Sequence, residues 1–251
     1  MPFTLAHPAL ILPLLRPCRR GLSATGLVLG SMAPDFEYFL RLRPDGIYGH
    51  TLAGIFWLDL PLVVLFTALF HSLVKQPLVA SLPALLRRRL APLTRQAWPM
   101  RRACSGPVLL GGFAGILSHL SWDAFTHDDG LVVLHWPALQ QPLALLHGTF
   151  PVYTWLQLGS TVAGLLAILT YLGALPRYSA AGPFVPAVAR RTFWLITGAG
   201  TGLLWGPFAW VSARIWPFSF NSVVVTGMSA ALVGLLAAAA VFRRQRAAGT
   251  E

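Results

Sequence analysis

The stretch GILSHLSWDAFTHDDG (residues 115–130) carries histidine and aspartate side chains four residues apart in an otherwise apolar segment. At 3.6 residues per turn, His119, Asp123 and His127 drift by only about 40° at each step, so the three side chains share one face of a helix. Imidazole and carboxylate groups are the usual protein ligands of zinc and similar divalent ions. The spacing favours a metal-binding helix, and the alternative is a helix end whose polar groups reach the head-group layer of a membrane.

The chain around this stretch has the composition of a membrane protein. Of its 251 residues, 55% are hydrophobic and 11% are charged, whereas soluble proteins carry roughly 25% charged residues. Apolar runs close to the roughly 20 residues that cross a bilayer recur along the chain; the clear candidates are 52–74, 154–175, 192–213 and 220–242, and weaker ones are 21–40 and 106–126. We predict an all-α polytopic transmembrane helix bundle of about six membrane helices, with a short helical hairpin as the alternative form of the first.

The distribution of positive charge gives the expected orientation. In a six-span topology, 16 of the 19 Lys and Arg residues fall in loops on one side, and only Arg41, Arg43 and Arg214 fall on the other. Basic loops stay on the cytoplasmic side during insertion, so we expect a protein of a bacterial-type cytoplasmic membrane, with the lipid bilayer as its partner. Topology also accounts for the formal net charge of +11, and we expect no nucleic-acid partner.

The ionisable residues divide the chain into two parts. All seven histidines lie before residue 148, and every acidic residue except Glu251 lies before residue 130. We therefore assign the chemistry to residues 1–153 and regard residues 154–251 as membrane scaffold helices of the same integral domain. Small residues such as Gly111 and Gly115, four positions apart, indicate close helix packing in lipid.

The same topology collects further candidate residues on the non-cytoplasmic side. Asp35 ends an apolar segment in the motif GSMAPDFEYF, and His50 begins the next one in YGHTLAG. A carboxylate in hydrocarbon is costly unless it is partnered, so intramembrane acids are functional by default. We expect one metal site on that side, formed by Asp35, His50, His119, Asp123 and His127.

Four residues are assigned to the surroundings of this site. Asp59, two turns inside the second span, is a candidate hydrogen-bond partner of a ligand histidine. His147 precedes the fourth span on the same side. Arg41 and Arg43 lie beside the acidic residues, and they either pair with them or bind an anionic substrate.

The position of His7 depends on the form of the first helix. A six-span topology places His7 on the cytoplasmic side, away from the other candidate ligands. If residues 7–15 and 21–33 form a hairpin of two short arms, His7 returns beside Asp35 and becomes a candidate ligand. The sequence leaves both arrangements open.

Several motifs carry a resemblance to a known family. In chain order they are MPFTLAHPA, LGSMAPDFEYF, GHTLAGIFWLDLPL, LSHLSWDAFTHDDG and PVYTWLQLGST. Over about residues 2–170, the chain resembles a bacterial membrane-protein family known as domain of unknown function 4184. This resemblance implies a membrane protein and supplies no reaction.

A more distant similarity carries chemistry. The order His, Pro-Asp, His, His-x-x-x-Asp and a further His is similar to that of the membrane-bound metal-dependent hydrolases. Beyond them, it is similar to that of the zinc-dependent phospholipase C and single-strand nuclease superfamily. It implies that Asp35, His50, His119 and Asp123 hold one metal ion, that Asp123 bridges to a second ion bound by His7, and that His127 serves another site. No acid follows His147 at the spacing of the superfamily's later pair, so one or two ions are expected rather than three.

These observations lead to the hypothesis of an integral-membrane, metal-dependent hydrolase that cleaves a phosphoester or related bond in a lipid-like, amphipathic substrate. Asp123 and His127 are the candidate catalytic residues, and zinc is the expected ion, with magnesium or manganese as alternatives. The candidate metal ligands are His7, Asp35, His50, His119, Asp123 and His127. A metal-dependent isoprenoid-diphosphate enzyme, of the prenyltransferase or terpene cyclase kind, and a non-enzymatic membrane carrier are the alternative functions.

The topology is testable by labelling in intact cells. A membrane-impermeant thiol reagent should label a cysteine placed at Gly130, in the loop expected outside, and should not label one placed at Ala97, in the basic loop expected inside. The reverse pattern would overturn the orientation drawn from the basic residues.

Overall fold

The computed structural model describes residues 3–15, 21–95, 97–145, 148–178 and 185–248. These residues form two compact units, each made of segments that are distant in the sequence. Unit 1 comprises Met1–Asp35, Ile47–Val64 and Cys104–Ala174, and unit 2 comprises Phe36–Gly46, Leu65–Ala103 and Leu175–Glu251. The class is all-α, as predicted, with one small β-hairpin that the sequence analysis did not anticipate.

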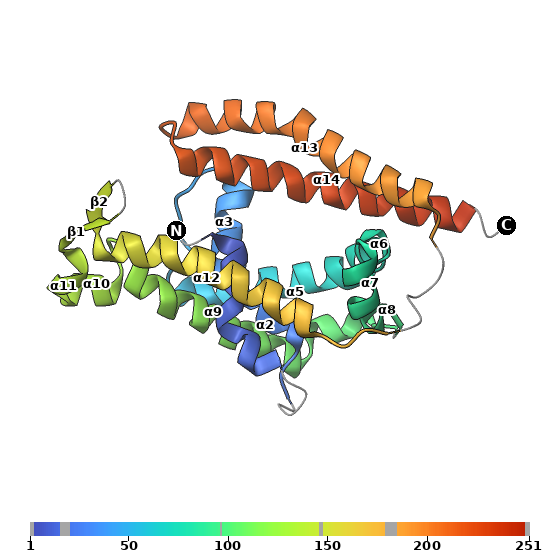
Figure 1. Ribbon diagram of the computed structural model, residues 1–251, viewed down its shortest axis with the longest axis horizontal. Helices are drawn as coiled ribbons and strands as arrows, with labels where there is room; N and C mark the ends of the chain where they lie inside the picture. Colours follow the sequence, from blue (N-terminus) through green and yellow to red (C-terminus); the bar gives the residue numbers. More distant parts are fainter. Residues whose placement is uncertain (1–2, 16–20, 96, 146–147, 179–184, 249–251) are drawn as a thin grey trace. The chain divides into compact units, whose positions relative to one another are not determined.

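Unit 1 is built mainly from short N-terminal helices and two long ones (Figure 1). Its hairpin pairs two antiparallel strands with Pro142 opposite Pro151. The elements that lie in this unit or begin in it are η1 (Thr4–Ala6), α1 (Pro8–Ile11), η2 (Leu12–Leu15), α2 (Ala24–Gly30), α3 (Ala33–Arg41), α4 (Leu52–Gly54), η3 (Ile55–Asp59), α5 (Leu60–Leu69), α9 (Gly106–Thr126), α10 (Leu131–His135), α11 (Pro137–Gln140), β1 (Pro142–Leu145), β2 (Gly148–Pro151) and α12 (Val152–Ala174).

Glycines let α2 and α9 touch along their backbones. A Cβ atom at Gly26 would lie 2.5 Å from the carbonyl oxygen of Val108, and one at Gly111 would lie 2.8 Å from that of Ser23. A Cβ atom at Gly115 would overlap the carbonyl oxygen of Leu27. The close packing expected for the small residues of α9 is therefore confirmed.

The apolar segment 21–40 is interrupted and does not form a single helix. Helix α2 ends at Gly30, and α3 begins at Ala33. Pro34 has no N–H to offer the carbonyl of Gly30, and the N–H of Asp35 donates to Met32 at 3.2 Å rather than to Ser31. The interruption leaves the Ser31 carbonyl available to a side chain and places Asp35 in the first turn of α3.

The second apolar segment is a continuous helix from Leu52 to Ser81 that contains two π-helical turns, η3 and η4 (Phe70–Val74). Each π turn lies shortly before a proline, Pro61 or Pro77. A proline removes one backbone donor, and a wider turn is one way in which a helix accommodates that loss. Asp59 ends the first π turn and is fully buried.

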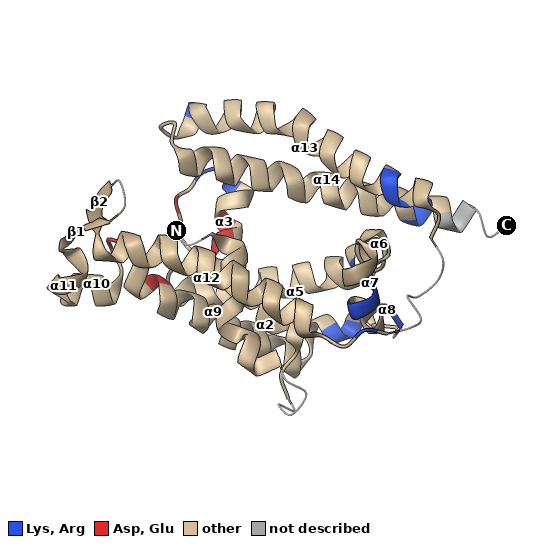
Figure 2. Ribbon diagram, in the orientation of Figure 1, with Lys and Arg blue, Asp and Glu red and all other residues tan. Residues whose placement is uncertain are grey.

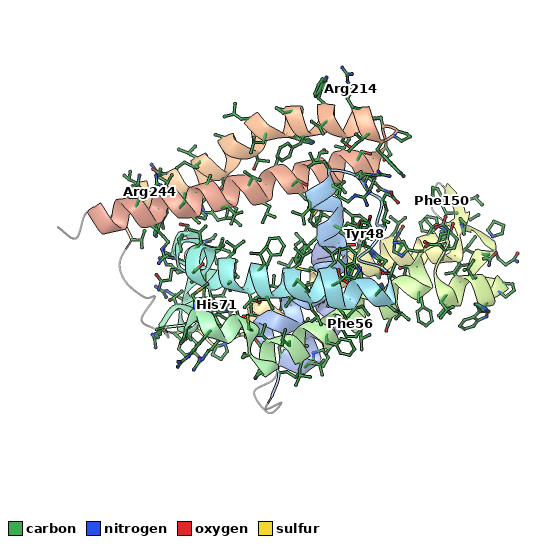
Figure 3. The ribbon with its side chains drawn as sticks, turned by 180° about the vertical axis from the view of Figure 1, so that it is seen from behind. Tyr48, Phe56, His71, Phe150, Arg214 and Arg244 are labelled. Carbon is green, nitrogen blue, oxygen red and sulfur yellow. The ribbon has the colours of Figure 1, made fainter. Side chains whose placement is uncertain are left out.

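Unit 2 contains a long helical hairpin, in which α13 (Ala187–Ile215) packs against α14 (Phe220–Ala248). A Cβ atom at Gly200 would lie 3.0 Å from Cα of Gly234, so the two helices also meet at glycines. Figure 3 shows Arg214 at one end of this hairpin and Arg244 at the other. The remaining elements of unit 2 are η4, α6 (Lys75–Ser81), α7 (Ala84–Leu90), α8 (Pro92–Arg95) and η5 (Met100–Cys104). Cys104, the last residue of η5, already belongs to unit 1.

Charged residues are unevenly distributed over the helices (Figure 2). Helix α7 carries Arg87, Arg88 and Arg89 in its last turn. Acidic residues lie on α3, at the end of η3, on α9 and in the loops that follow α3 and α9. Basic residues are concentrated on α7, whereas α3 carries Arg41 together with Asp35 and Glu37.

Four helices of the described residues are long and apolar enough to cross a membrane: Leu52–Ser81, Gly106–His135, Val152–Ala174 and Phe220–Gln245. Large apolar side chains on these helices are exposed, as in Phe56 (65%; Figure 3), Leu166 (57%) and Leu169 (63%). Such surfaces suit contact with lipid. The expected span 192–213 lies within α13, whose glycines, threonines and tryptophans lower its hydropathy, and it is not among the four.

Substitution of Gly115 should test the backbone contact. Gly115→Ala places a Cβ atom 2.6 Å from the backbone nitrogen of Ser31, and overpacking of this kind costs roughly 1–3 kcal/mol. We expect a lower midpoint of thermal unfolding in detergent. Gly173→Ala in α12 is the matched control, because its Cβ atom would meet nothing within 4 Å. Equal midpoints for the two variants would contradict the contact.

Candidate metal centre

The candidate metal ligands come from five places along the chain, all within unit 1. Helix α9 supplies His119 and Asp123, and His127 follows directly after its last residue. The other three ligands lie in the turn between η1 and α1, in the first turn of α3 and in the turn before α4; they are His7, Asp35 and His50.

Asp123 is the common neighbour of all four histidines. Its Oδ2 atom lies 3.1 Å from Nε2 of His119 and 3.4 Å from Nε2 of His50. Its Oδ1 atom lies 3.7 Å from Nε2 of His7 and 3.6 Å from Nδ1 of His127. The central position in the helical triplet thus becomes the central position of the cluster.

Asp35 faces the same imidazoles from α3. Its Oδ1 atom lies 3.5 Å from Nε2 of His119 and 3.7 Å from Nε2 of His50. Its Oδ2 atom accepts a hydrogen bond of 2.6 Å from the hydroxyl of Thr4. One carboxylate oxygen is therefore held by the protein, and the other is turned toward the histidines.

The break between α2 and α3 orients His119. Nδ1 of His119 lies 2.9 Å from the carbonyl oxygen of Ser31, to which it donates a hydrogen bond when Nδ1 carries the proton. The lone pair is then on Nε2, which faces both carboxylates. A backbone carbonyl that fixes the tautomer of a histidine in this way is typical of metal ligands.

His7 lies beside His119, whereas the short-hairpin arrangement predicts a position beside Asp35. The two rings are stacked, with centroids 3.8 Å apart and an angle of 16° between their planes. Helix α1 also contacts α2, so the two short arms that the sequence left as one alternative are present. Residues 16–20, which connect them, lie outside the described residues.

The cluster is closed on one side and open on the other. His7, Asp35 and His119 are at most 3% exposed, and Asp123 is 7% exposed. The side chains of His50 and His127 are 23% and 20% exposed. Solvent can therefore reach the cluster past His50 and His127.

The donor atoms fit a divalent cation. Nε2 of His119, Oδ1 of Asp35 and both carboxylate oxygens of Asp123 are buried without a hydrogen-bond partner among the described residues. Two sets of three ligand atoms lie within 4.8 Å of one another: His7, His119 and Asp123, and Asp35, His50 and His119. Bonds of about 2.0–2.2 Å in tetrahedral geometry would put ligand atoms about 3.4 Å apart, close to the spacings observed.

Thr4 is a contributor that the sequence analysis missed, because a single hydroxyl near the chain start forms no pattern. Asp59, the predicted hydrogen-bond partner of a ligand histidine, ends η3 and lies near the turn that precedes α4. A Cβ atom at Gly49 would be 3.1 Å from Oδ1 of Asp59. The buried carboxylate therefore abuts the turn that carries His50.

Arg41 and Arg43 belong to unit 2 and engage acidic residues there. Arg41 donates to Glu37 at 2.5 Å, and Arg43 donates to Asp45 at 2.5 Å. The guanidinium of Arg43 also lies 4.7 Å from the ring centre of Trp216. Of the two sequence-based alternatives, pairing with acids is the one observed.

His147, the remaining residue that was predicted near the site, lies outside the described residues.

The fold and the site define a class of protein: an all-α chain with helices apolar enough to cross a membrane and a buried cluster of imidazoles and carboxylates. The chain belongs to a family described as domain of unknown function (DUF4184), whose pattern matches residues 1–240. The matched region is longer than residues 2–170, the part of the chain whose motifs resemble that family. The chain matches no curated protein and no solved structure.

Thr4→Val should weaken metal binding. The substitution removes the hydroxyl that holds Oδ2 of Asp35 and keeps the volume of the side chain. Loss of such a supporting hydrogen bond typically lowers metal affinity by about 10–100-fold, which a competition titration of zinc against a chromogenic chelator would measure. Thr170→Val is the control, because that exposed hydroxyl bonds only within its own helix. Equal zinc affinities would exclude a role for Thr4.

Proposed function

We propose that the protein is an integral-membrane, metal-dependent hydrolase that cleaves a phosphoester or related bond in a lipid-like substrate. The observation that carries the proposal is a pair of buried carboxylates. Oδ1 of Asp35 and both oxygens of Asp123 face imidazole nitrogens and have no hydrogen-bond partner among the described residues. Buried charges of this kind are costly unless they are paired or coordinate a metal. Four histidines beside two aspartates favour zinc over magnesium, which prefers oxygen ligands.

A bound zinc ion would lower the pKa of a coordinated water molecule and polarise the scissile group. His7, Asp35, His50, His119 and Asp123 are the residues that would hold metal. Asp123 would also fix the orientation of the surrounding imidazoles, because it neighbours all of them.

His127 is the candidate acid or base. Its Nε2 atom is buried without a hydrogen-bond partner among the described residues, and its Nδ1 atom lies 3.2 Å from the backbone carbonyl of Asp123. With Nδ1 protonated toward that carbonyl, Nε2 can accept a proton during water attack and return it to the leaving oxygen. Its partial exposure leaves room for a substrate.

The lipid-like character of the substrate is inferred from the surroundings of the cluster. α9 carries the central ligands and lies within one of the four apolar helices. A polar group hydrolysed at this position would be joined to an apolar part that stays in the bilayer. Free sugars or nucleotides would gain nothing from such a site.

The membrane topology is part of the proposal. We propose about six membrane crossings, with α13 and the short N-terminal helices supplementing the four long apolar helices. The cluster would face the non-cytoplasmic side, because 16 of the 19 basic residues, those of α7 among them, lie in segments expected on the cytoplasmic side. The two ends of the α13–α14 hairpin, marked by Arg214 and Arg244 in Figure 3, would then face opposite sides of the membrane.

Asp123→Asn should abolish both metal binding and hydrolysis while leaving the protein inserted. The amide keeps the shape of the side chain and removes the charge that all four histidines face. Bound divalent metal per protein and release of phosphate-containing product from lipid phosphoesters are the measurements. We expect a fall of at least about a hundredfold in kcat/KM, which corresponds to about 2.7 kcal/mol.

His71→Ala is the control for that substitution. His71 lies in η4, in unit 2, and stacks on Trp98 with ring centroids 3.9 Å apart. Its loss should leave metal content and hydrolysis within about twofold of wild type, a change below about 0.5 kcal/mol. Equal metal content in wild type and Asp123→Asn would refute the metal centre itself.

A further inference from the structure

A cleft in unit 1 adjoins the candidate metal centre. Its volume is about 450 Å³, and it is lined by residues of η1, α1, α9 and α12 and by His7. This volume lies within the roughly 300–1,000 Å³ of small-molecule binding sites. Nearly all of its lining side chains are apolar, and the two exceptions with polar side-chain atoms, apart from the indole nitrogens, are His7 and Ser160.

The cleft has the length of a hydrocarbon chain in one leaflet of a bilayer. Along α12 its lining residues run from Trp155 to Ala167 and recur every four positions, mostly as adjacent pairs. At 1.5 Å per residue this distance is about 18 Å. One leaflet contributes about 15 Å, half of the roughly 30 Å hydrocarbon core.

The lining offers apolar contact and little hydrogen bonding. The indole N–H of Trp122 donates to the hydroxyl of Ser160 at 3.1 Å, and that of Trp155 donates to the carbonyl of Leu143 at 2.8 Å. With their polar atoms engaged, both indoles present ring surface to the cleft. Small residues on α12, including Gly159 and Ala163, line the cleft without filling it.

His7 connects the cleft to the metal centre. It lines the cleft, it is 3% exposed, and neither of its ring nitrogens has a hydrogen-bond partner among the described residues. Its ring stacks on His119, and its Nε2 atom lies 3.7 Å from Asp123. Trp122, on the cleft wall, directly precedes Asp123. A ligand in the cleft therefore lies next to the centre.

We infer that this cleft binds a single long hydrocarbon chain of the substrate, whose phosphoester lies at the metal centre. The inference rests on the proposed hydrolase function and adds to it the part of the substrate that is recognised and the residues that select it. An apolar chain fits this lining, because the apolar side chains offer it close van der Waals contact and no polar lining atom loses a partner.

Substitution of Gly159 tests the inference by filling the cleft. Gly159 is a suitable position, because a Cβ atom there meets nothing within 4 Å, and the ring of Gly159→Phe would extend from that atom. The substrates are hexadecyl and butyl para-nitrophenyl phosphate. Water adds to phosphorus, the phosphorus–oxygen bond to nitrophenolate breaks, and the released nitrophenolate is measured by absorbance in nanodiscs. Gly159→Phe should lower kcat/KM for the hexadecyl ester by about tenfold or more and change that for the butyl ester by less than about twofold.

Gly173→Phe is the matched control on the same helix, since its Cβ atom also meets nothing within 4 Å and Gly173 does not line the cleft. It should leave the ratio of the two kcat/KM values unchanged. Suppose that wild type hydrolyses both esters. If Gly159→Phe then lowers kcat/KM equally for the two esters, or lowers it for neither, the hydrocarbon chain is not bound in the cleft. If wild type hydrolyses neither ester, the proposed hydrolase function fails, and the cleft is judged by binding alone.

Binding is measured with a hexadecyl phosphonate that carries a photoreactive diazirine on its chain. Cross-links should map to residues 155–167, should be competed by unlabelled hexadecyl phosphonate, and should be lost in Gly159→Phe but kept in Gly173→Phe. Cross-links spread over the other apolar helices would indicate bulk lipid contact and overturn the inference. So would a dimer that Gly159→Phe dissociates, because the cleft would then hold a helix of a second copy.

Discussion

Two carboxylates buried in an apolar protein, Asp35 and Asp123, impose the constraint on which the rest of the site depends. A buried charge without compensation costs several kcal/mol, even after the surroundings relax. The protein supplies one hydroxyl to Asp35 and turns imidazole nitrogens toward the remaining oxygens. Because neutral imidazole nitrogens and carboxylate oxygens both carry lone pairs, a cation bound between them would accept electron pairs from several of these atoms at once.

The backbone contact between α2 and α9 makes this arrangement possible. Glycines on both helices let the interrupted end of α2 approach α9 closely. The carbonyl of Ser31, released from helical bonding by the turn before Pro34, then reaches Nδ1 of His119 at 2.9 Å. A bulkier residue at the contact would separate the two helices and lose the hydrogen bond that orients the most buried ligand. The orientation of His119 thus depends on helix packing, through the carbonyl of Ser31.

The sequence predicts the parts of the site that depend on local periodicity or on topology. The spacing of His119, Asp123 and His127 follows from helix geometry alone, and charge asymmetry grouped Asp35 and His50 with them. His7 stayed open, because its place depends on how two short arms fold back. Thr4 was not predicted for a similar reason. Its contact with Asp35 joins residues that are distant in the sequence and depends on the folded chain. Apolar composition likewise could not distinguish a membrane span from the two short helices α2 and α3.

The two sides of the cluster differ in a way that bears on the competing functions. His50 and His127 are accessible to solvent, whereas His7 on the other side lines an apolar cleft. A carrier would need polar side chains along a path through several spans, yet α12 has no charged residue or histidine, and the arginines of α14 lie near its end. An isoprenoid-diphosphate enzyme would need clustered carboxylates for magnesium, and here histidines outnumber aspartates at the centre. A site with water on one side and a hydrocarbon-sized cleft on the other suits a reaction that separates a polar group from an apolar chain.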